Sequence, residues 1–183
     1  DVAYFKRVAD SLQTVYPNSV YVRSLKDEVA KKENMLALSN RLKAAEELAY
    51  PELSLPDTKS EVHKLSSLLG KPFILIFWTS TVAQQKMFNH DLKELYKKYN
   101  PKGLEIYQVS ADVDKASWAT IVKEQELPWI NVCDGFGAQS TALHTYGVST
   151  LPAMFIFDKA GTIVAKNIFD KAALDRELAK LSY

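Results

Sequence analysis

The sequence contains a single cysteine, Cys133, in 183 residues. One thiol excludes a disulfide within these residues, a zinc site built from two or four cysteines, and any redox cycle that needs two thiols. Long hydrophobic runs are missing as well. The longest uninterrupted apolar run, residues 73–78, has six residues, whereas a membrane-spanning helix needs about 20. We therefore expect no membrane span in this chain.

Charge of neither sign is in excess. The 23 lysines and arginines nearly balance the 22 aspartates and glutamates, so the formal net charge is +1. This balance excludes the electrostatic surface that nucleic-acid or anionic-membrane binders present, and we expect no nucleic-acid partner. A hydrophobic fraction of 47% is ordinary for a globular protein, and the length suffices for one domain with an appendage.

The first fifty residues contain no glycine and only one proline, Pro17, so they lack the residues that punctuate strands and tight turns. All six glycines lie at or beyond Gly70, and neither residue type occurs between Pro17 and Pro51. We expect a helix over residues 1–16 and a second helix from about residue 19, long enough to break near Asn34 or Asn40. Residues 1–49 are assigned to a helical N-terminal region and residues 50–183 to a second domain.

The start of the chain indicates processing. Residue 1 is Asp1, with neither an initiator methionine nor an apolar leader. This suggests a mature or trimmed product, in which any export signal, lipid anchor or preceding domain would no longer be visible.

From Tyr50 onward, short apolar runs alternate with amphipathic segments. This pattern is typical of βα units on a mostly parallel sheet. The expected strands are residues 52–55, 73–78, 104–109, 129–132, 153–157 and 162–165. The expected helices are residues 81–99, 115–126, 138–146 and 171–181.

Three separated motifs carry a resemblance to a known family. The first is residues 70–81, GKPFILIFWTST; the second is DVD at 112–114 with Trp118 and LPW at 127–129; the third is residues 146–158, YGVSTLPAMFIFD, closed by KAGTIV. In this order they closely resemble the thioredoxin-like, AhpC/TSA (redoxin) proteins of the bacterial cell envelope, in the subgroup tied to cytochrome maturation. The match covers about residues 50–183.

The resemblance implies a thioredoxin-like α/β fold, a central mixed β-sheet flanked by helices. It also implies thiol-disulfide oxidoreductase chemistry and a location in the periplasm or cell envelope of a Gram-negative bacterium. Residues 1–49 resemble, more weakly, the linker segment of longer envelope lipoproteins of this kind.

One motif of that family is missing. Its Cys-x-x-Cys follows the Phe-Trp strand after three residues, at a helix N-terminus that lowers the pKa of the first thiol. Here Val82 occupies the place of the attacking thiol and Gln85 that of the resolving thiol. The peroxiredoxin motif Thr-x-x-Cys would fall on residues 79–82, where its threonine is present and its cysteine absent. No catalytic residue is therefore expected.

The other half of the family's site is retained. Pro152 occupies the place of the family's cis-proline, and Leu151 would present its backbone to an extended polypeptide as one more strand. The alternative is that Pro152 only shapes its loop. The binding surface expected from the resemblance comprises Trp78, Thr79, Ser80, Thr81, Val82, Leu151 and Pro152.

Several of these residues have a simpler structural role open to them. Trp78 is either part of the core or the floor of the binding surface, and the hydroxyls of residues 79–81 either bind an anion or, as we expect, cap the helix that follows. Asp112 and Asp114 follow the carboxyl end of the strand expected at residues 104–109, where α/β folds bind ligands. The simpler prediction is that the loop is solvated and that Asp114 caps the next helix.

The remaining reactive residues show no functional pattern. Cys133 has no lysine, arginine or histidine nearby, which predicts an inert thiol with a near-normal or raised pKa. His63, His90 and His144 share no metal-ligand spacing, so neither a metal nor a cofactor is expected. His90 and Asp91 are neighbours on a helix and do not face each other.

The leading hypothesis is a redox-inactive thioredoxin-fold protein that binds an extended segment of a partner protein. The first alternative is a thiol-disulfide oxidoreductase or antioxidant of the redoxin type. The second is a structural spacer in a larger envelope lipoprotein.

Overall fold

The computed structural model describes residues 2–47 and 50–183, which fall into two compact units divided between Glu47 and Leu48. Leu48, the last apolar residue expected on the second helix, lies outside the described residues. Residue 49, at which the helical N-terminal region was expected to end, lies outside them as well. In the described ranges, no helix combines the length and apolarity needed to cross a membrane.

The N-terminal unit consists of two helices, α1 (Val2–Val15) and α2 (Val20–Glu47). Ala9, Val22 and Val29 are buried, and an ion pair joins Lys6 of α1 to Glu33 of α2 at 3.0 Å. The break expected near Asn34 or Asn40 is wrong, because α2 continues through both positions. An asparagine inside a helix costs less than about 1 kcal/mol, and no glycine or proline accompanies it.

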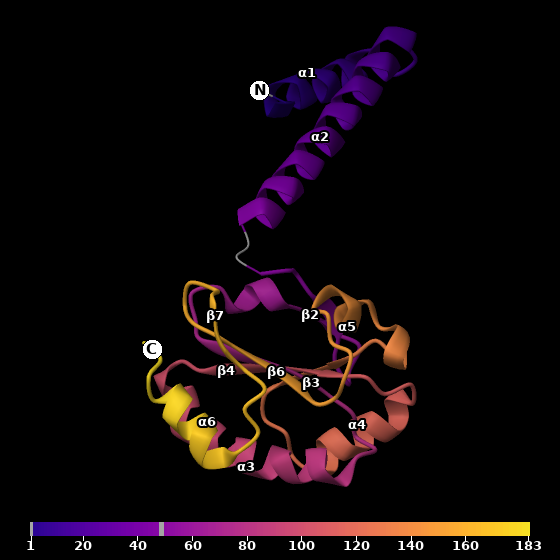
Figure 1. Cartoon of the computed structure of the whole chain (residues 1–183). Coiled ribbons are helices and arrows are strands. Elements are labelled where there is room, and N and C mark those ends of the chain that lie inside the picture. The colour runs from indigo at the N-terminus through magenta and orange to yellow at the C-terminus, as the bar shows by residue number, and fades with distance from the viewer. Residues whose placement is uncertain (1, 48–49) are drawn as a thin grey trace. The chain divides into compact units, whose positions relative to one another are not determined.

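The second unit is built on a five-stranded sheet with the order β5-β4-β3-β6-β7 (Figure 1). Strands β3, β4 and β5 are parallel, whereas β6 is antiparallel to β3 and β7 is antiparallel to β6. The fold is thioredoxin-like, and the sheet is mixed as the resemblance implied. The strands are β3 (Phe73–Trp78), β4 (Glu105–Ser110), β5 (Ile130–Cys133), β6 (Ala153–Phe157) and β7 (Ile163–Lys166).

The expectation of a mostly parallel sheet was therefore wrong in part. A short turn joins β6 to β7, closed by the Asp158 amide donating to the Thr162 carbonyl at 3.0 Å. Strands joined by so short a connection must run antiparallel, because a parallel pair needs a crossover of a dozen or more residues.

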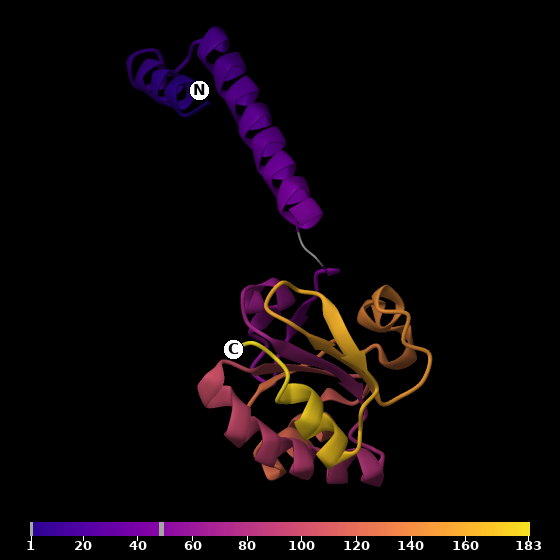
Figure 2. The ribbon, with the colours of Figure 1, turned by 60° about the vertical axis from the view of Figure 1, so that its left-hand side comes forward.

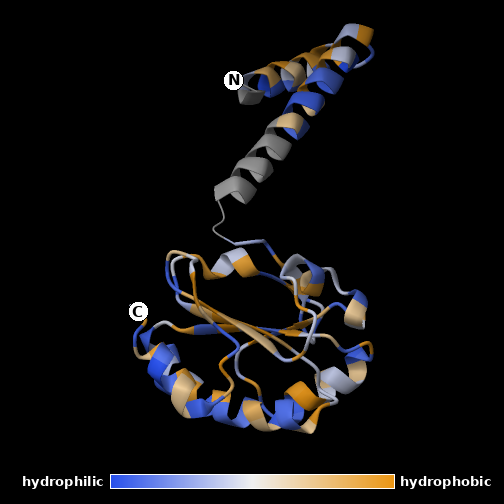
Figure 3. Ribbon diagram, in the orientation of Figure 1, coloured by the Kyte–Doolittle hydropathy of each residue, from blue (hydrophilic) through white to orange (hydrophobic). Residues whose placement is uncertain are grey.

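Helices cover one face of the sheet, and shorter elements cover the other (Figures 1 and 2). On the first face lie α3 (Ala83–Tyr99), α4 (Lys115–Glu124) and α6 (Lys171–Leu178). Their apolar sides, with Leu92, Trp118 and Leu174, pack on the sheet, and the outer sides of α3 and α6 are largely hydrophilic (Figure 3). The opposite core contains Leu65 and Leu143.

Several short elements differ from the expected ones. The strand expected at residues 52–55 lies at β1 (Ser54–Pro56), which pairs with the unexpected three-residue β2 (Val62–Lys64) in a separate small sheet. The expected helix 138–146 is a 3₁₀ turn, η3 (Gly137–Gln139), followed by α5 (Thr141–Thr145). Two further 3₁₀ turns are η1 (Leu65–Leu68) and η2 (Asn100–Lys102).

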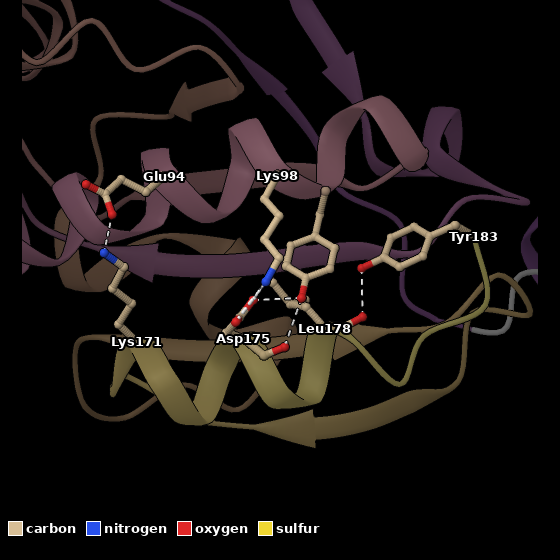
Figure 4. Close-up of polar contacts among 7 residues, drawn as sticks. Glu94, Lys98, Lys171, Asp175, Leu178 and Tyr183 are labelled. Atoms are coloured by element: carbon tan, nitrogen blue, oxygen red, sulfur yellow. Dashed lines mark hydrogen bonds and ion pairs between the residues drawn. The ribbon is translucent and has the colours of Figure 1, made fainter.

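Polar contacts fasten α3 to α6 (Figure 4). Lys98 Nζ lies 2.7 Å from Asp175 Oδ1, and the Tyr99 hydroxyl donates to the same oxygen at 2.7 Å. Lys171 pairs with Glu94. Tyr183, near the chain's C-terminal end, stacks on Tyr99. These contacts fix the position of α3, whose first turn contributes to the candidate site.

Candidate functional site

The candidate site lies where β3 ends and α3 begins. Trp78 is the last residue of β3, and Val82 is the N-cap of α3. The antiparallel register places Phe77 opposite Ala153, so the loop after β3 and the Leu151–Pro152 segment before β6 leave the sheet at the same end. The Leu151–Pro152 peptide bond is cis.

A buried carboxylate organises the loop after β3. Asp112 is only 6% exposed, and its oxygens accept hydrogen bonds from the Thr79 hydroxyl at 2.6 Å, the Ser80 amide at 2.9 Å and the Ser110 hydroxyl at 2.6 Å. A buried carboxylate is tolerated when it is hydrogen-bonded in this way. Asp112, which was predicted only to be solvated in a loop, therefore fixes the conformation of residues 79–80.

Gln85 holds the same loop from the helix side. Its side chain is buried, and its Oε1 accepts a hydrogen bond from the Thr79 amide at 2.7 Å. If the β3–β6 pairing continued two residues beyond Phe77 and Ala153, Thr79 would lie opposite Leu151. The Thr79 amide instead donates to Gln85, so it does not extend the pairing of β3 with β6. Gln85 thus has a structural role at this position.

The hydroxyl cluster does not cap α3, contrary to our expectation. The N-cap residue is Val82, and no side-chain cap hydrogen bond is formed there. The Thr79 hydroxyl instead binds Asp112 and lies 3.0 Å from the Thr81 hydroxyl. The Thr79 hydroxyl donates to the buried carboxylate of Asp112 instead of accepting from an amide at the start of α3. Asp112 lies 33 residues away, so its proximity could not be predicted from the local sequence. By contrast, Asp114 caps α4 as predicted, accepting from the Ala116 and Ser117 amides.

Only part of the expected binding surface is reachable from solvent. Trp78 is 1% exposed and belongs to the core on the α3 side of the sheet, which decides between the two roles that the sequence left open for its side chain. Ser80 is also buried. Thr81 is exposed, and the half-buried members are Thr79, Val82, Leu151 and Pro152.

The backbone of Leu151 is available for pairing. Within the part of the chain that the structure describes, neither its amide nor its carbonyl takes a backbone partner. Its side chain packs against the core that includes Phe77 and Leu143. A fixed residue with free backbone groups can add a strand-like segment from another polypeptide.

Cys133 lies away from the redox positions of the motif. It is the last residue of β5 and is fully buried, and its Sγ lies 3.4 Å from the Asp112 carbonyl. Burial is the main cause that raises the pKa of the thiol, and the charges of Asp134 and Asp112 add to it. A buried thiol with a raised pKa is neither accessible nor ionised at neutral pH, as the sequence predicted.

The three histidines lie apart from this site. His90 is exposed and lies 3.9 Å from Glu94, not beside Asp91, and His144 is exposed on α5. His63 lies on β2, where its Nε2 is 3.0 Å from Asp57 Oδ2. Spacing between histidines alone misses this contact. The signal that could have found it is the presence of Asp57 and Glu61 within six residues before His63, in a segment short enough to be a tight turn.

Comparisons with known proteins agree with this architecture. The AhpC/TSA family profile matches residues 47–166. The thiol-disulfide oxidoreductase ResA of Bacillus cereus is 30% identical over 134 residues, which are 72% of this chain and 76% of the relative.

Solved structures give the same result. A thiol-disulfide oxidoreductase from Bacteroides fragilis is 31% identical, with a TM-score of 0.65 over 72% of this chain and 98% of that chain. A thioredoxin-like protein from Bacteroides vulgatus is 34% identical, with a TM-score of 0.62 over 72% of this chain and 85% of that one. The chain therefore belongs to the AhpC/TSA family, as a thioredoxin-like protein related to the thiol-disulfide oxidoreductases.

Proposed function

We propose that this protein is a redox-inactive member of its family that binds an extended segment of a partner protein. The observation that carries the proposal is the side-chain chemistry at the start of α3. Val82 at its N-cap and Gln85 in its first turn take the places of the two thiols, and Gln85 is already engaged with the Thr79 amide. Neither side chain can attack a disulfide or resolve a mixed disulfide.

The members of the surface that solvent reaches support binding. Thr81, Val82, Leu151 and Pro152 lie at one end of the sheet, and the loop beside them is fixed by Asp112. A surface that is ordered before the partner arrives loses little conformational entropy on binding. Leu151 offers an amide and a carbonyl that take no backbone partner among the described residues, so a partner segment would pair with its backbone while apolar side chains contact Val82 and Pro152.

Thiol-disulfide oxidoreductase activity is the second candidate, because the names of the relatives favour it. Within these 183 residues that chemistry would have to use Cys133. Exchange requires an accessible thiolate, whereas Cys133 is buried and its pKa is raised. We therefore rank this function below binding. We also propose the bacterial cell envelope as the location, on the resemblance stated above, and residues 1–49 as a separate helical region.

The test measures capture of partners from an envelope extract by the wild type and by Leu151→Asp. A charged side chain at Leu151 disrupts the proposed surface, so partners that bind there are expected to be lost. The matched control is Val164→Asp, an exposed valine on the distant edge strand β7, which should retain them. Identical partner sets for all three proteins would contradict the proposed surface and favour a spacer role.

A further inference from the structure

A second group of polar side chains lies on the small β1–β2 sheet. Asp57 follows β1, Glu61 lies in the turn, and His63 is the middle residue of β2. One potential ligand atom from each residue lies within 4.8 Å of the other two. We propose that these three side chains form a binding site for a divalent transition-metal ion of the zinc class.

The spacing of the donor atoms fits one ion. His63 Nε2 and Asp57 Oδ2 are 3.0 Å apart. Two donors at this separation, each about 2.1 Å from an ion, subtend an angle of about 90°, as neighbouring ligands do in octahedral sites. A tetrahedral zinc ion needs about 3.4 Å between them, so the two atoms would move apart by about 0.4 Å when it binds. The mixture of one imidazole and two carboxylates favours zinc and its neighbours over calcium or magnesium, which prefer oxygen ligands alone.

The turn that carries these ligands is fixed in advance. Asp57 Oδ1 accepts hydrogen bonds from the amides of Lys59 at 2.8 Å and Glu61 at 2.9 Å, which leaves Oδ2 directed to His63. The carbonyl of His63 accepts from the Tyr107 hydroxyl at 2.8 Å, which ties β2 to β4. Ligands held by other contacts bind a metal with a smaller entropic cost.

Charge also favours a cation here. Among the described residues, no lysine or arginine forms an ion pair with Asp57 or Glu61. Glu105, the first residue of β4, lines the same cavity as Asp57 and His63. In the part of the chain that the structure describes, none of these three carboxylates lies within 4.0 Å of a lysine or arginine nitrogen.

An independent observation comes from Asn131 on β5. The residue is 6% exposed and lines the same cavity, of about 290 Å³, as Asp57 and His63. Its Oδ1 is buried and has no hydrogen-bond partner among the described residues, which ordinarily costs about 1–3 kcal/mol. Because this oxygen has less than 1 Å² of exposed surface, a water bound to the ion could hydrogen-bond to it only after the Asn131 side chain turned toward the cavity.

This site is separate from the surface proposed above. Glu105 and Ile130 begin β4 and β5, whereas the loop that Asp112 organises lies after the other ends of the parallel strands. The metal site therefore does not depend on the proposed binding function, and each can fail without the other.

The test is titration of the metal-free full chain with Zn²⁺ in competition with a chromogenic chelator. We expect one Zn²⁺ per chain, and an affinity at least about tenfold lower in His63→Ala and in Glu61→Gln. Glu61 is exposed, so Glu61→Gln should not unfold the protein. The matched control is His90→Ala, which removes another histidine beside a carboxylate, 3.9 Å from Glu94, and should bind as the wild type does.

Two kinds of result would overturn the site. One is the absence of Zn²⁺ binding by the wild type, or equal binding by the wild type and both cluster variants; Asp57 and His63 would then form only a hydrogen bond that stabilises the turn. The other is loss of binding in His90→Ala, which would place the ion on α3.

Discussion

The side-chain oxygen of Gln85 accepts a hydrogen bond from the backbone amide of Thr79 at 2.7 Å. Gln85 lies in the first turn of α3, at the position that the resemblance assigns to a resolving thiol, and Thr79 is the first residue after β3. A glutamine there satisfies a backbone donor inside the loop. The residue at this position therefore stabilises the loop after β3, although it cannot act as a thiol.

Replacing Gln85 by leucine should destabilise the fold. The Thr79 amide would lose its partner, and a polar group left unsatisfied costs about 1–3 kcal/mol. Chemical denaturation measures the difference in the free energy of unfolding. Gln84→Leu is the matched control, because Gln84 is exposed and surface changes are usually within about 0.5 kcal/mol. Equal stabilities of the two variants would contradict the role assigned to Gln85.

Removal of the Asp112 carboxylate should cost more. Asp112→Ala leaves the Thr79 hydroxyl, the Ser80 amide and the Ser110 hydroxyl without their acceptor, and we expect a loss of at least about 3 kcal/mol. Asp114→Ala, which removes the N-cap of α4, should cost about 1 kcal/mol. Thermal or denaturant unfolding gives both values, and the reverse order would show that Asp112 does not organise the loop.

Cys133 should react slowly in the folded protein. Its side chain is fully buried, and burial raises its pKa. Alkylation by iodoacetamide at neutral pH, followed by mass spectrometry, should therefore modify the native protein far more slowly than the denatured one. Rapid alkylation of the folded chain at mildly acidic pH would mean an accessible thiolate and would revive the oxidoreductase function.

The contact between α3 and α6 should weaken in acid. Hydrogen bonds from Lys98 and Tyr99 hold the pKa of Asp175 below its ordinary value of 3.8. A carboxylate whose pKa is lower in the folded state than in the unfolded state stabilises the fold fully at pH values above its unfolded-state pKa. This contribution is lost as the pH falls through its folded-state pKa. Asp175→Asn should thus lower the melting temperature at pH 7, with a deficit that shrinks toward pH 2.

The effect of Asp175→Asn will be modest, since the side chain is 36% exposed and solvent screens the ion pair. Asp91→Asn is the matched control on α3, because Asp91 lies 3.9 Å from Lys171 and its side chain, at 43%, is more exposed than that of Asp175. A deficit that is the same at both pH values would mean that the Asp175 charge is not responsible.

Much of the fold followed from the sequence because apolar periodicity reports which residues face a core. The fully buried β3 was predicted to the residue, Phe73–Trp78. The short β2 was missed, since its three residues, Val62–Lys64, are mostly exposed and owe their pairing to β1. Propensity also could not show that α2 continues past Asn34 and Asn40, where the cost of asparagine is small.

The candidate site was predictable only where the determinants are local. The cap at Asp114 depends on the next three residues and was predicted. The contact of Thr79 with Asp112 joins residues 33 positions apart, so the sequence suggested helix capping instead. The group at Asp57 and His63 was missed for a different reason, because only the spacing between histidines was considered, whereas a turn brings an aspartate and a histidine together.

The most direct test of the account is disulfide reductase activity, measured for the wild type and for the double variant Val82→Cys plus Gln85→Cys under the same conditions. We expect no activity in the wild type. The double variant should be active, because it restores two thiols at the start of α3, where the helix N-terminus favours a thiolate. Reductase activity in the wild type would contradict the central claim that this thioredoxin-like chain does not perform thiol-disulfide exchange.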